Sequence, residues 1–298
     1  MATERWPLER VATLPAEETV VWATASVAAR VRERLPFAAW SPNEPLPANA
    51  KNLIVAGGGT MLDEAKRFVH DDAPHVRLIA IPTIWGSGAE ASPVVVLNHG
   101  GAKEIRLDDA YLPQARAVWE ELASTIPFAQ ARAACGDAWS HALEGFLSPL
   151  ATGALRGEIA AIMREMADVG VGNDGRWFEL SARAAAAQAR SSVGLVHGVA
   201  HTLEAVTGFG HARLCAAYLR PVFAFDRRVA KVEELLHAHG LDAAAIAAQT
   251  EALFDAGDYR ATLPALEREW PRVLRERNTR TNAVLVRAAD LPFFLEFS

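Results

Sequence analysis

The segment Asn52–Lys66, NLIVAGGGTMLDEAK, joins a short apolar run to a stretch with helical spacing through three successive glycines. The run Asn52–Ala56 predicts a buried β-strand, and a helix is predicted over Asp63–Val69. Glycines at such a turn let the backbone approach a ligand closely, and the N–H groups at a helix start attract phosphate. The segment therefore predicts a strand–turn–helix unit of an α/β fold.

The glycine turn alone does not identify a ligand. It differs from the GxGxxG fingerprint and from the Walker A loop, and a tight turn without a ligand, with Thr60 as N-cap of the helix, explains it equally well. A second loop, Pro82–Ser92 (PTIWGSGAEAS), also follows a predicted strand and is rich in small residues. The hydroxyl groups of Thr83, Ser87 and Ser92 are candidates for a second wall of a nucleotide site. The alternative is a flexible surface loop.

Strands and helices alternate around this segment. Further strands are predicted at Glu18–Thr24, Val76–Ile81 and Val94–Leu97, with a short one at Phe37–Trp40. A helix is predicted over residues 25–35, ASVAARVRERL. This alternation predicts a mainly parallel sheet covered by helices. We place this Rossmann-like, nucleotide-binding α/β domain at residues 1–118.

The pattern changes after about Trp119. Segments rich in Ala, Leu, Arg and Glu follow, and strand signals are almost absent. Helices are predicted at residues 127–147, 151–168, 177–206, 212–225, 229–237, 241–256, 262–277 and 280–289. We therefore predict an all-helical second domain over residues 119–298.

Potential metal ligands are spaced by one helical turn in this second domain. Asp137 and His141, in GDAWSHALEG, project from one face of a predicted helix. His197 and His201 repeat the spacing, and His211 follows a glycine-rich turn. A carboxylate with several imidazoles suits Zn²⁺ or Fe²⁺. Spacing alone does not separate a metal site from histidines that are ordinary surface or core residues.

The bulk composition excludes several classes of protein. The 298 residues carry a net charge of −6 with both signs mixed, so the basic stripe of a nucleic-acid-binding surface is missing. Cys135 and Cys215 lie far apart and outside any CxxC motif, which predicts reduced thiols. The charged N-terminus lacks the apolar segment of a signal peptide, and no run approaches the roughly 18 apolar residues of a membrane span. We expect a cytoplasmic protein.

Several motifs, in order, resemble those of the iron-dependent (group III) alcohol dehydrogenases. The resemblance covers about residues 50–225, and its order and gaps agree with the family. The matching segments are Gly57–Lys66 (GGGSxxDxAK in the family), Pro82–Glu90 (PTxxGTGSE, with Ser87 and Ala89 substituted), AKEI at Lys103, Gly136–Glu144 (GxDAxxHxxE), Gly194–His201 (GxxHxxxH) and Gly210–Ala212 (Pro-His-Gly).

The resemblance implies a Rossmann-like domain, a helical domain and a cleft between them, as in the related 3-dehydroquinate synthase-like enzymes. It implies a divalent metal, Fe²⁺ or Zn²⁺, on Asp137, His141, His197 and His211. It implies NAD or NADP near Gly57, Gly58, Gly59, Thr60, Asp63, Thr83, Ser87, Ser92 and Lys103. His201 matches a histidine commonly assigned to proton handling. The implied function is an alcohol dehydrogenase or aldehyde reductase for a small substrate, working as a homodimer.

The chain also departs from the family pattern. The region before Lys51 is compressed, and Thr24-Ala25-Ser26 stands where the family often has an acid, so NADP becomes a candidate. Cys215 replaces an Asn, while Arg213 and Arg220 are either exposed helix residues or contacts for an anionic substrate. Two other functions remain open. One is a 3-dehydroquinate synthase-like lyase, although those enzymes usually present one carboxylate and two histidines. The other is a degenerate homologue that binds without catalysis.

Overall fold

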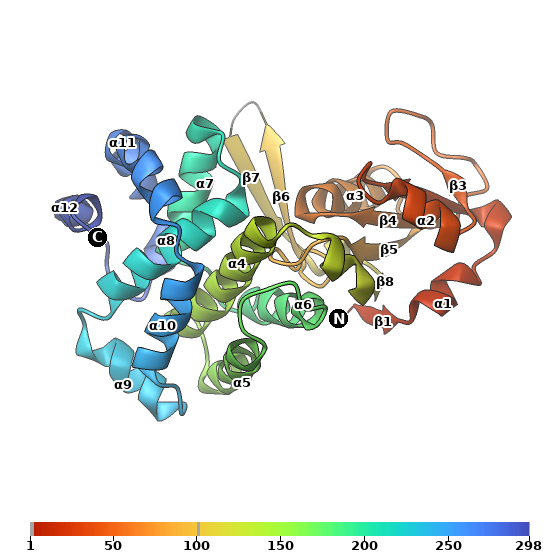
Figure 1. Cartoon of the computed structure of the whole chain (residues 1–298). Helices are drawn as coiled ribbons and strands as arrows, with labels where there is room; N and C mark the ends of the chain where they lie inside the picture. The colour runs from red at the N-terminus through yellow and green to blue at the C-terminus, as the bar shows by residue number, and fades with distance from the viewer. Residues whose placement is uncertain (1–2, 100–101, 298) are drawn as a thin grey trace. The chain divides into compact units, whose positions relative to one another are not determined.

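The computed structural model describes residues 3–99 and 102–297, which form two compact units (Figure 1). The first unit contains the described residues of Met1–Ile126 together with Asp174–Ala182. The second contains Pro127–Asn173 and the described residues of Arg183–Ser298. The boundary predicted after residue 118 therefore falls inside the first unit.

The first unit is built on a six-stranded parallel sheet in the order β1-β8-β5-β4-β2-β3 (Figure 1). Its strands are β1 Glu4–Trp6, β2 Thr19–Ala23, β3 Ala38–Ala39, β4 Asn52–Gly57, β5 Arg77–Pro82 and β8 Ala115–Ala117. The central strand β4 is buried throughout, as expected for a parallel strand covered on both faces. The parallel sheet is as predicted. The three-residue strands β1 and β8 were missed because they are too short to show a period.

Helix α3, Gly59–Asp71, covers one face of this sheet. Leu62, Ala65 and Val69 of α3 pack in one core cluster with Leu53 and Val55 of β4, which alternate along the strand on one face of the pleat. The remaining helices and turns of this part of the chain are α1 Leu8–Ala12, η1 Ala16–Glu18, α2 Ala28–Arg34, η2 Asp109–Tyr111, η3 Glu120–Thr125 and α6 Arg176–Gln188, whose first residues belong to this unit.

The segment Asp174–Ala182 is tied to the first unit by specific contacts. Glu179 accepts two hydrogen bonds, both 2.9 Å, from the guanidinium of Arg116 on β8. Ser181 Oγ accepts a hydrogen bond from Gly86 N at 2.8 Å, and the rings of Phe178 and Trp85 meet edge to face at 5.4 Å. These contacts are made by side chains distant in sequence, which explains why residue composition did not reveal them.

The predicted strand Val94–Leu97 is present as β6, Val94–His99, but it lies outside the parallel sheet. It pairs antiparallel with β7, Ala102–Leu107, as a two-stranded sheet. Asp63 Oδ2 accepts a hydrogen bond from Val96 N at 3.0 Å, and Lys66 Nζ donates to Val94 O. These two side chains hydrogen-bond β6 to α3, so β6 lies beside this helix and not in the main sheet.

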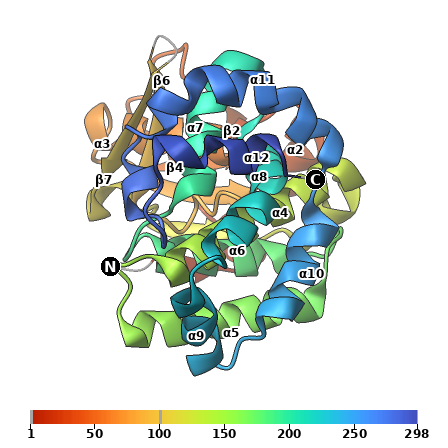
Figure 2. The same ribbon diagram turned by 90° about the vertical axis from the view of Figure 1, so that its left-hand side faces the viewer.

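The second unit is helical. Its elements are α4 Phe128–Leu147, α5 Gly153–Val169, α7 Leu195–Thr207, α8 His211–Asp226, α9 Ala230–Ala238, α10 Ala243–Leu253, α11 Ala256–Val273, η4 Asn278–Thr281, η5 Ala288–Asp290 and α12 Leu291–Leu295. Helix α8 packs against α4, α7, α10 and α11 (Figure 2). The two helices α4 and α8 approach closely at Gly136 of α4, where an added Cβ would lie 2.7 Å from the Ala216 Cα of α8.

Two helix predictions in this region are wrong. The helix predicted over 177–206 is interrupted between α6 and α7, and 280–289 forms 3₁₀ turns and loop instead of an α-helix. The new helix α7 begins where Asn282 accepts a hydrogen bond from Leu195 N and Glu144 accepts one from Val196 N. Because these capping groups come from distant parts of the chain, local periodicity could not reveal the break.

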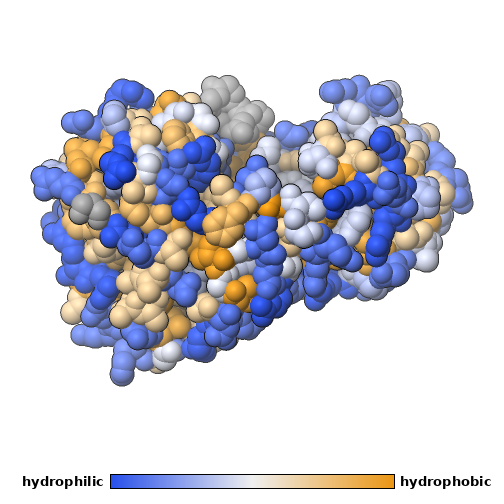
Figure 3. Space-filling model, in the orientation of Figure 1, coloured by the Kyte–Doolittle hydropathy of each residue, from blue (hydrophilic) through white to orange (hydrophobic). Residues whose placement is uncertain are grey.

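Hydrophilic and hydrophobic residues are intermixed on the face drawn in Figure 3. Large hydrophobic side chains that are exposed in the described part of the chain are scattered in sequence: Leu107, Phe128, Leu150, Val206, Val229 and Leu285. Within residues 3–99 and 102–297, none of the helices combines the length and hydropathy needed to cross a lipid bilayer.

A buried carboxyl group lies in the loop between β5 and β6. Glu90 is 2% exposed and its Oε1 atom has no hydrogen-bond partner among the described residues. Burial raises the pKa of Glu90 from an ordinary 4.5 to about 7, against the opposing charges of Arg116 and Lys66. Between pH 4.5 and about 7, the folded protein therefore retains a proton on Glu90 that the unfolded chain loses.

We predict that Gly136→Ala destabilises the second unit by about 1–3 kcal/mol, because the added methyl meets the backbone of Ala216. Chemical denaturation measures the free energy of unfolding. Gly157→Ala, in the exposed face of α5 with nothing within 4 Å of the new Cβ, is the matched control and should be neutral or stabilising by up to about 1 kcal/mol. Equal effects at the two sites would contradict the close approach of α4 and α8.

We also predict a pH dependence of stability from Glu90. Its folded-state pKa lies above its unfolded value, so its contribution to stability is full below about 4.5 and is lost as pH rises toward about 7. Glu90→Gln should remove this decline and raise the free energy of unfolding above pH 7 by up to roughly 3 kcal/mol. Unfolding curves at several pH values check it, with the exposed Glu64→Gln as control. An unchanged pH profile in Glu90→Gln would refute the assignment.

Candidate metal centre

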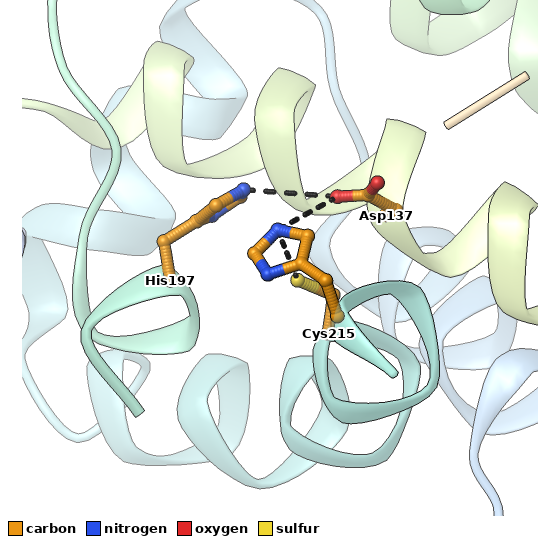
Figure 4. Close-up of side chains that lie close together, drawn as sticks. Asp137, His197 and Cys215 are labelled. Carbon is orange, nitrogen blue, oxygen red and sulfur yellow. Dashed lines mark hydrogen bonds and ion pairs between the residues drawn. The ribbon is translucent and has the colours of Figure 1, made fainter. Parts of the chain in front are cut away.

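Three helices of the second unit bring the candidate metal ligands together (Figure 4). Helix α4 carries Asp137 and His141, α7 carries His197, and α8 begins at His211. The four-residue spacing on α4 places Asp137 and His141 on one face, as predicted. The structure thus joins all four residues that the sequence indicated as ligands.

A single oxygen atom lies at the centre of the cluster. Asp137 Oδ1 is 3.6 Å from His141 Nδ1 and 3.7 Å from the Nε2 atoms of both His197 and His211. Nε2 of His197 is also 3.2 Å from Nε2 of His141. Asp137 is 2% exposed, and its Oδ1 has no hydrogen-bond partner in the described part of the chain. A buried carboxylate oxygen of this kind needs a cation or a donor.

Cys215 joins this cluster, although the sequence indicated it only as a replacement for Asn. It lies four residues after His211 on α8, and its Sγ is 3.5 Å from His211 Nε2. Asp137, His197, His211 and Cys215 each offer a ligand atom, and these atoms lie within 4.8 Å of one another. The signal available in the sequence was the helical spacing from His211.

The local electrostatics favour an ionised carboxylate and a protonated thiol. Burial opposes ionisation of Asp137, but attraction to His141, His211 and His197 lowers its pKa below the ordinary value. Burial, together with the negative charges of Asp137 and Glu144, raises the pKa of the Cys215 thiol well above its usual range. A bound divalent ion would reverse the preference of the thiol, because coordination deprotonates it. The carboxylate would stay ionised.

Glu144 orients His197 from outside the cluster. Its Oε2 atom lies 2.7 Å from His197 Nδ1, and its Oε1 atom accepts a hydrogen bond from Val196 N at 2.5 Å. An ionised carboxylate only accepts, so Nδ1 of His197 is the donor to Glu144 and Nε2 is the nitrogen that faces Asp137. This carboxylate–histidine arrangement is typical of metal sites. The motif of the sequence contained Glu144, but its role was not predicted.

A second buried carboxyl group extends this arrangement. Asp226 accepts a hydrogen bond from Asn282 Nδ2 at 2.7 Å. Burial raises the pKa of Asp226 to about 8, and the negative charge of Glu144 acts in the same direction. No periodic pattern pointed to either residue, because the contact joins the end of α8 to a loop 56 residues later.

His201 lies beside the cluster, one turn after His197 on α7. Its ring stacks on that of His211 with centroids 5.1 Å apart. Its Nδ1 atom lies 3.2 Å from Asn278 Nδ2 and 3.8 Å from Glu276 Oε1. The hydrogen bond from His201 lowers the pKa of Glu276.

The glycine turn in the first unit forms an uncapped helix start. Gly58 is the N-cap of α3 and no side chain caps the helix, so Thr60 is exposed in the first turn and its interpretation as N-cap is wrong. The two predicted loops meet: Thr83 N donates to Gly57 O at 3.0 Å, and a Cβ on Gly59 would lie 2.5 Å from Ser87 Oγ. A free helix N-terminus beside close-packed loops suits an anionic group.

Other predicted nucleotide contacts are engaged within the protein. Asp63 is buried, with its Oδ1 atom 3.0 Å from Lys66 Nζ and its Oδ2 atom bound to β6 as described above. Ser92 is also buried, and its Oγ accepts a hydrogen bond from Val94 N at 3.2 Å. Lys103 lies on β7 and is half-buried. These positions remain predictions as nucleotide contacts.

Known proteins similar to this chain share one family. No family model matches the chain. The probable alcohol dehydrogenase EutG of Escherichia coli is 29% identical over 206 residues, covering 60% of this chain and 52% of that protein. The 1-propanol dehydrogenase PduQ of Salmonella typhimurium is 28% identical over 193 residues, covering 59% and 52%. The aligned region thus spans about half the length of these curated relatives.

Solved structures match the fold over nearly the whole chain. The iron-containing alcohol dehydrogenase of Thermococcus thioreducens has a TM-score of 0.78 at 18% identity, covering 98% of this chain and 97% of that one. The maleylacetate reductase of Agrobacterium tumefaciens has a TM-score of 0.79 at 17% identity, covering 99% and 95%. These matches confirm the predicted fold class. The homologues and structural matches of this chain are thus iron-containing (group III) alcohol dehydrogenases, at modest sequence identity.

Proposed function

We propose that this protein is a metal-dependent, NAD(P)-linked oxidoreductase that interconverts a small alcohol and its aldehyde or ketone. The observation that carries the proposal is the buried Asp137 Oδ1 atom, which lacks a hydrogen-bond partner in the described part of the chain and faces three imidazoles. Such an arrangement fits a divalent cation better than it fits a protein core.

Asp137, His141, His197 and His211 would hold the ion. Their nitrogen and oxygen donors suit Fe²⁺ or Zn²⁺. When bound, such an ion supplies Lewis acidity, which polarises a substrate carbonyl or lowers the pKa of an alcohol. Glu144 would keep His197 in the ligating tautomer.

His201 is the proposed proton relay. It is 8% exposed and stacks on His211, while its Nδ1 atom faces Asn278 and Glu276. The side chain of Glu276 is 27% exposed. A proton held at the His201 ring therefore has a carboxylate neighbour that reaches water, which suits a group that passes protons between substrate and solvent.

The dinucleotide would bind at the start of α3 in the first unit. The uncapped N–H groups after Gly58 suit a pyrophosphate, and the nicotinamide supplies the hydride chemistry. Strand β2 ends at Ala23 and is followed by Thr24-Ala25-Ser26 without an acid. Nothing in this segment repels a 2′-phosphate, so both NAD and NADP are candidates.

The relatives and two arginines support the proposed substrate class. One relative is a 1-propanol dehydrogenase and another, from Pseudomonas knackmussii, is a maleylacetate reductase. Arg213 is paired with Asp258 at 2.5–2.9 Å, and Arg220 is paired with Glu251. Because carboxylates of the protein already engage both guanidinium groups, we favour an uncharged alcohol over an anionic substrate.

We predict that protein purified without chelators carries about one Fe or Zn ion per chain, and that His197→Ala combined with His211→Ala abolishes it. Elemental analysis measures the content. His237→Ala, an exposed histidine on α9, is the control and should keep the metal. A wild-type protein that is metal-free and stays so after Fe²⁺ or Zn²⁺ is added would refute the metal centre.

We also predict hydride transfer when aldehydes are supplied with NADH or NADPH, followed by nicotinamide absorbance. His201→Asn should lower kcat by about 10²–10⁴-fold and change the pH profile, since it removes a titrating group. Its metal content should match that of wild type. Bound metal without hydride transfer to any substrate would instead favour the elimination chemistry of 3-dehydroquinate synthase-like enzymes.

A further inference from the structure

We propose that Cys215 is a further ligand of the metal, so that a thiolate biases this centre toward ions that bind sulfur well, Zn²⁺ above Fe²⁺. The inference rests on the metal centre proposed above and concerns the sulfur alone.

The geometry places the sulfur among the donors. Cys215 and His211 are one turn apart on α8, with Sγ and Nε2 3.5 Å apart. The Sγ atom lies within 4.8 Å of ligand atoms of Asp137, His197 and His211. Asp137 Oδ1, in a residue 2% exposed, has no hydrogen-bond partner among the described residues. This orphaned oxygen points independently to a cation at the place that the sulfur reaches.

The second cysteine shows what an ordinary buried thiol looks like in this protein. Cys135 is as buried as Cys215, but its sulfur lies against the carbonyl oxygen of Gly172, at 3.9 Å. Cys215 instead faces a carboxylate and imidazoles. A thiol that served only as a small apolar group would not be expected among charged donors.

The sulfur of Cys215 adds a donor of another kind to the oxygen and nitrogen donors of Asp137, His141, His197 and His211. On coordination the S–H bond breaks, the proton leaves to water and a sulfur–metal bond forms, without oxidation or reduction. A thiolate neutralises one further charge of a divalent ion, and soft donors favour Zn²⁺.

Cobalt substitution of the full-length protein tests the proposal. Co²⁺ bound to a thiolate gives a sulfur-to-metal charge-transfer band in the near ultraviolet, besides its visible ligand-field bands. Wild type should show both. Cys215→Ser should keep the ligand-field bands and lose the charge-transfer band, whereas Cys135→Ser should retain both. Zn²⁺ affinity should fall by at least about tenfold in Cys215→Ser, because even a mutation next to the metal ligands costs about that much. Fe²⁺ affinity should fall less.

The outcomes separate the two proposals. Ligand-field bands without a charge-transfer band in wild type would overturn the role of Cys215 and leave the metal centre intact. No Co²⁺ binding at all would overturn the metal centre itself. If Cys215→Ser fails to fold, Cys135→Ser decides. The chain has two cysteines, so a band that survives in Cys135→Ser belongs to Cys215, and one that disappears there refutes the proposal.

Discussion

The second unit is organised around one buried negative charge. Asp137 is almost completely removed from water, and a carboxylate in such a place is costly unless positive charge or hydrogen-bond donors surround it. Helices α4, α7 and α8 direct imidazole nitrogens at the same oxygen, and a cation held among these atoms would meet this requirement. Close contact of α4 and α8 is a condition for this convergence, and Gly136, next to Asp137, permits it. The packing and the chemistry therefore depend on neighbouring residues of α4.

The same constraint explains the less obvious polar residues around the cluster. Glu144 orients His197 through a hydrogen bond at Nδ1, and the ligating role proposed for this ring requires such a partner. Glu144 also accepts from the start of α7, so one side chain both begins the helix and orients the ring it carries. Asn282 likewise accepts a hydrogen bond from Leu195 N at the start of α7, and its amide group donates one to Asp226. The break before α7 thus lies where these two side chains accept hydrogen bonds from the N–H groups of the helix start.

In the first unit, buried polar side chains pair with each other and with backbone groups. Buried Lys66 and Asp63 of α3 satisfy the backbone of β6, which keeps the two-stranded sheet attached to the helix that follows the glycine turn. The start of α3 itself is left uncapped and the neighbouring loop packs against Gly59 too closely for a side chain. Structural hydrogen bonds are made at the middle of α3, while its N-terminus stays available for an anion.

The sequence by itself determined the parallel sheet, the helical second part and the ligand spacing on α4. Those features follow from local periodicity and from motifs in a fixed order. Only the tertiary structure decided that β6 leaves the main sheet, that 177–206 is two helices and that residues 174–182 join the first unit. It also decided that Cys215 lies among the donors while Cys135 does not. These outcomes depend on contacts between different helices and strands, and such contacts leave no periodic trace along the chain.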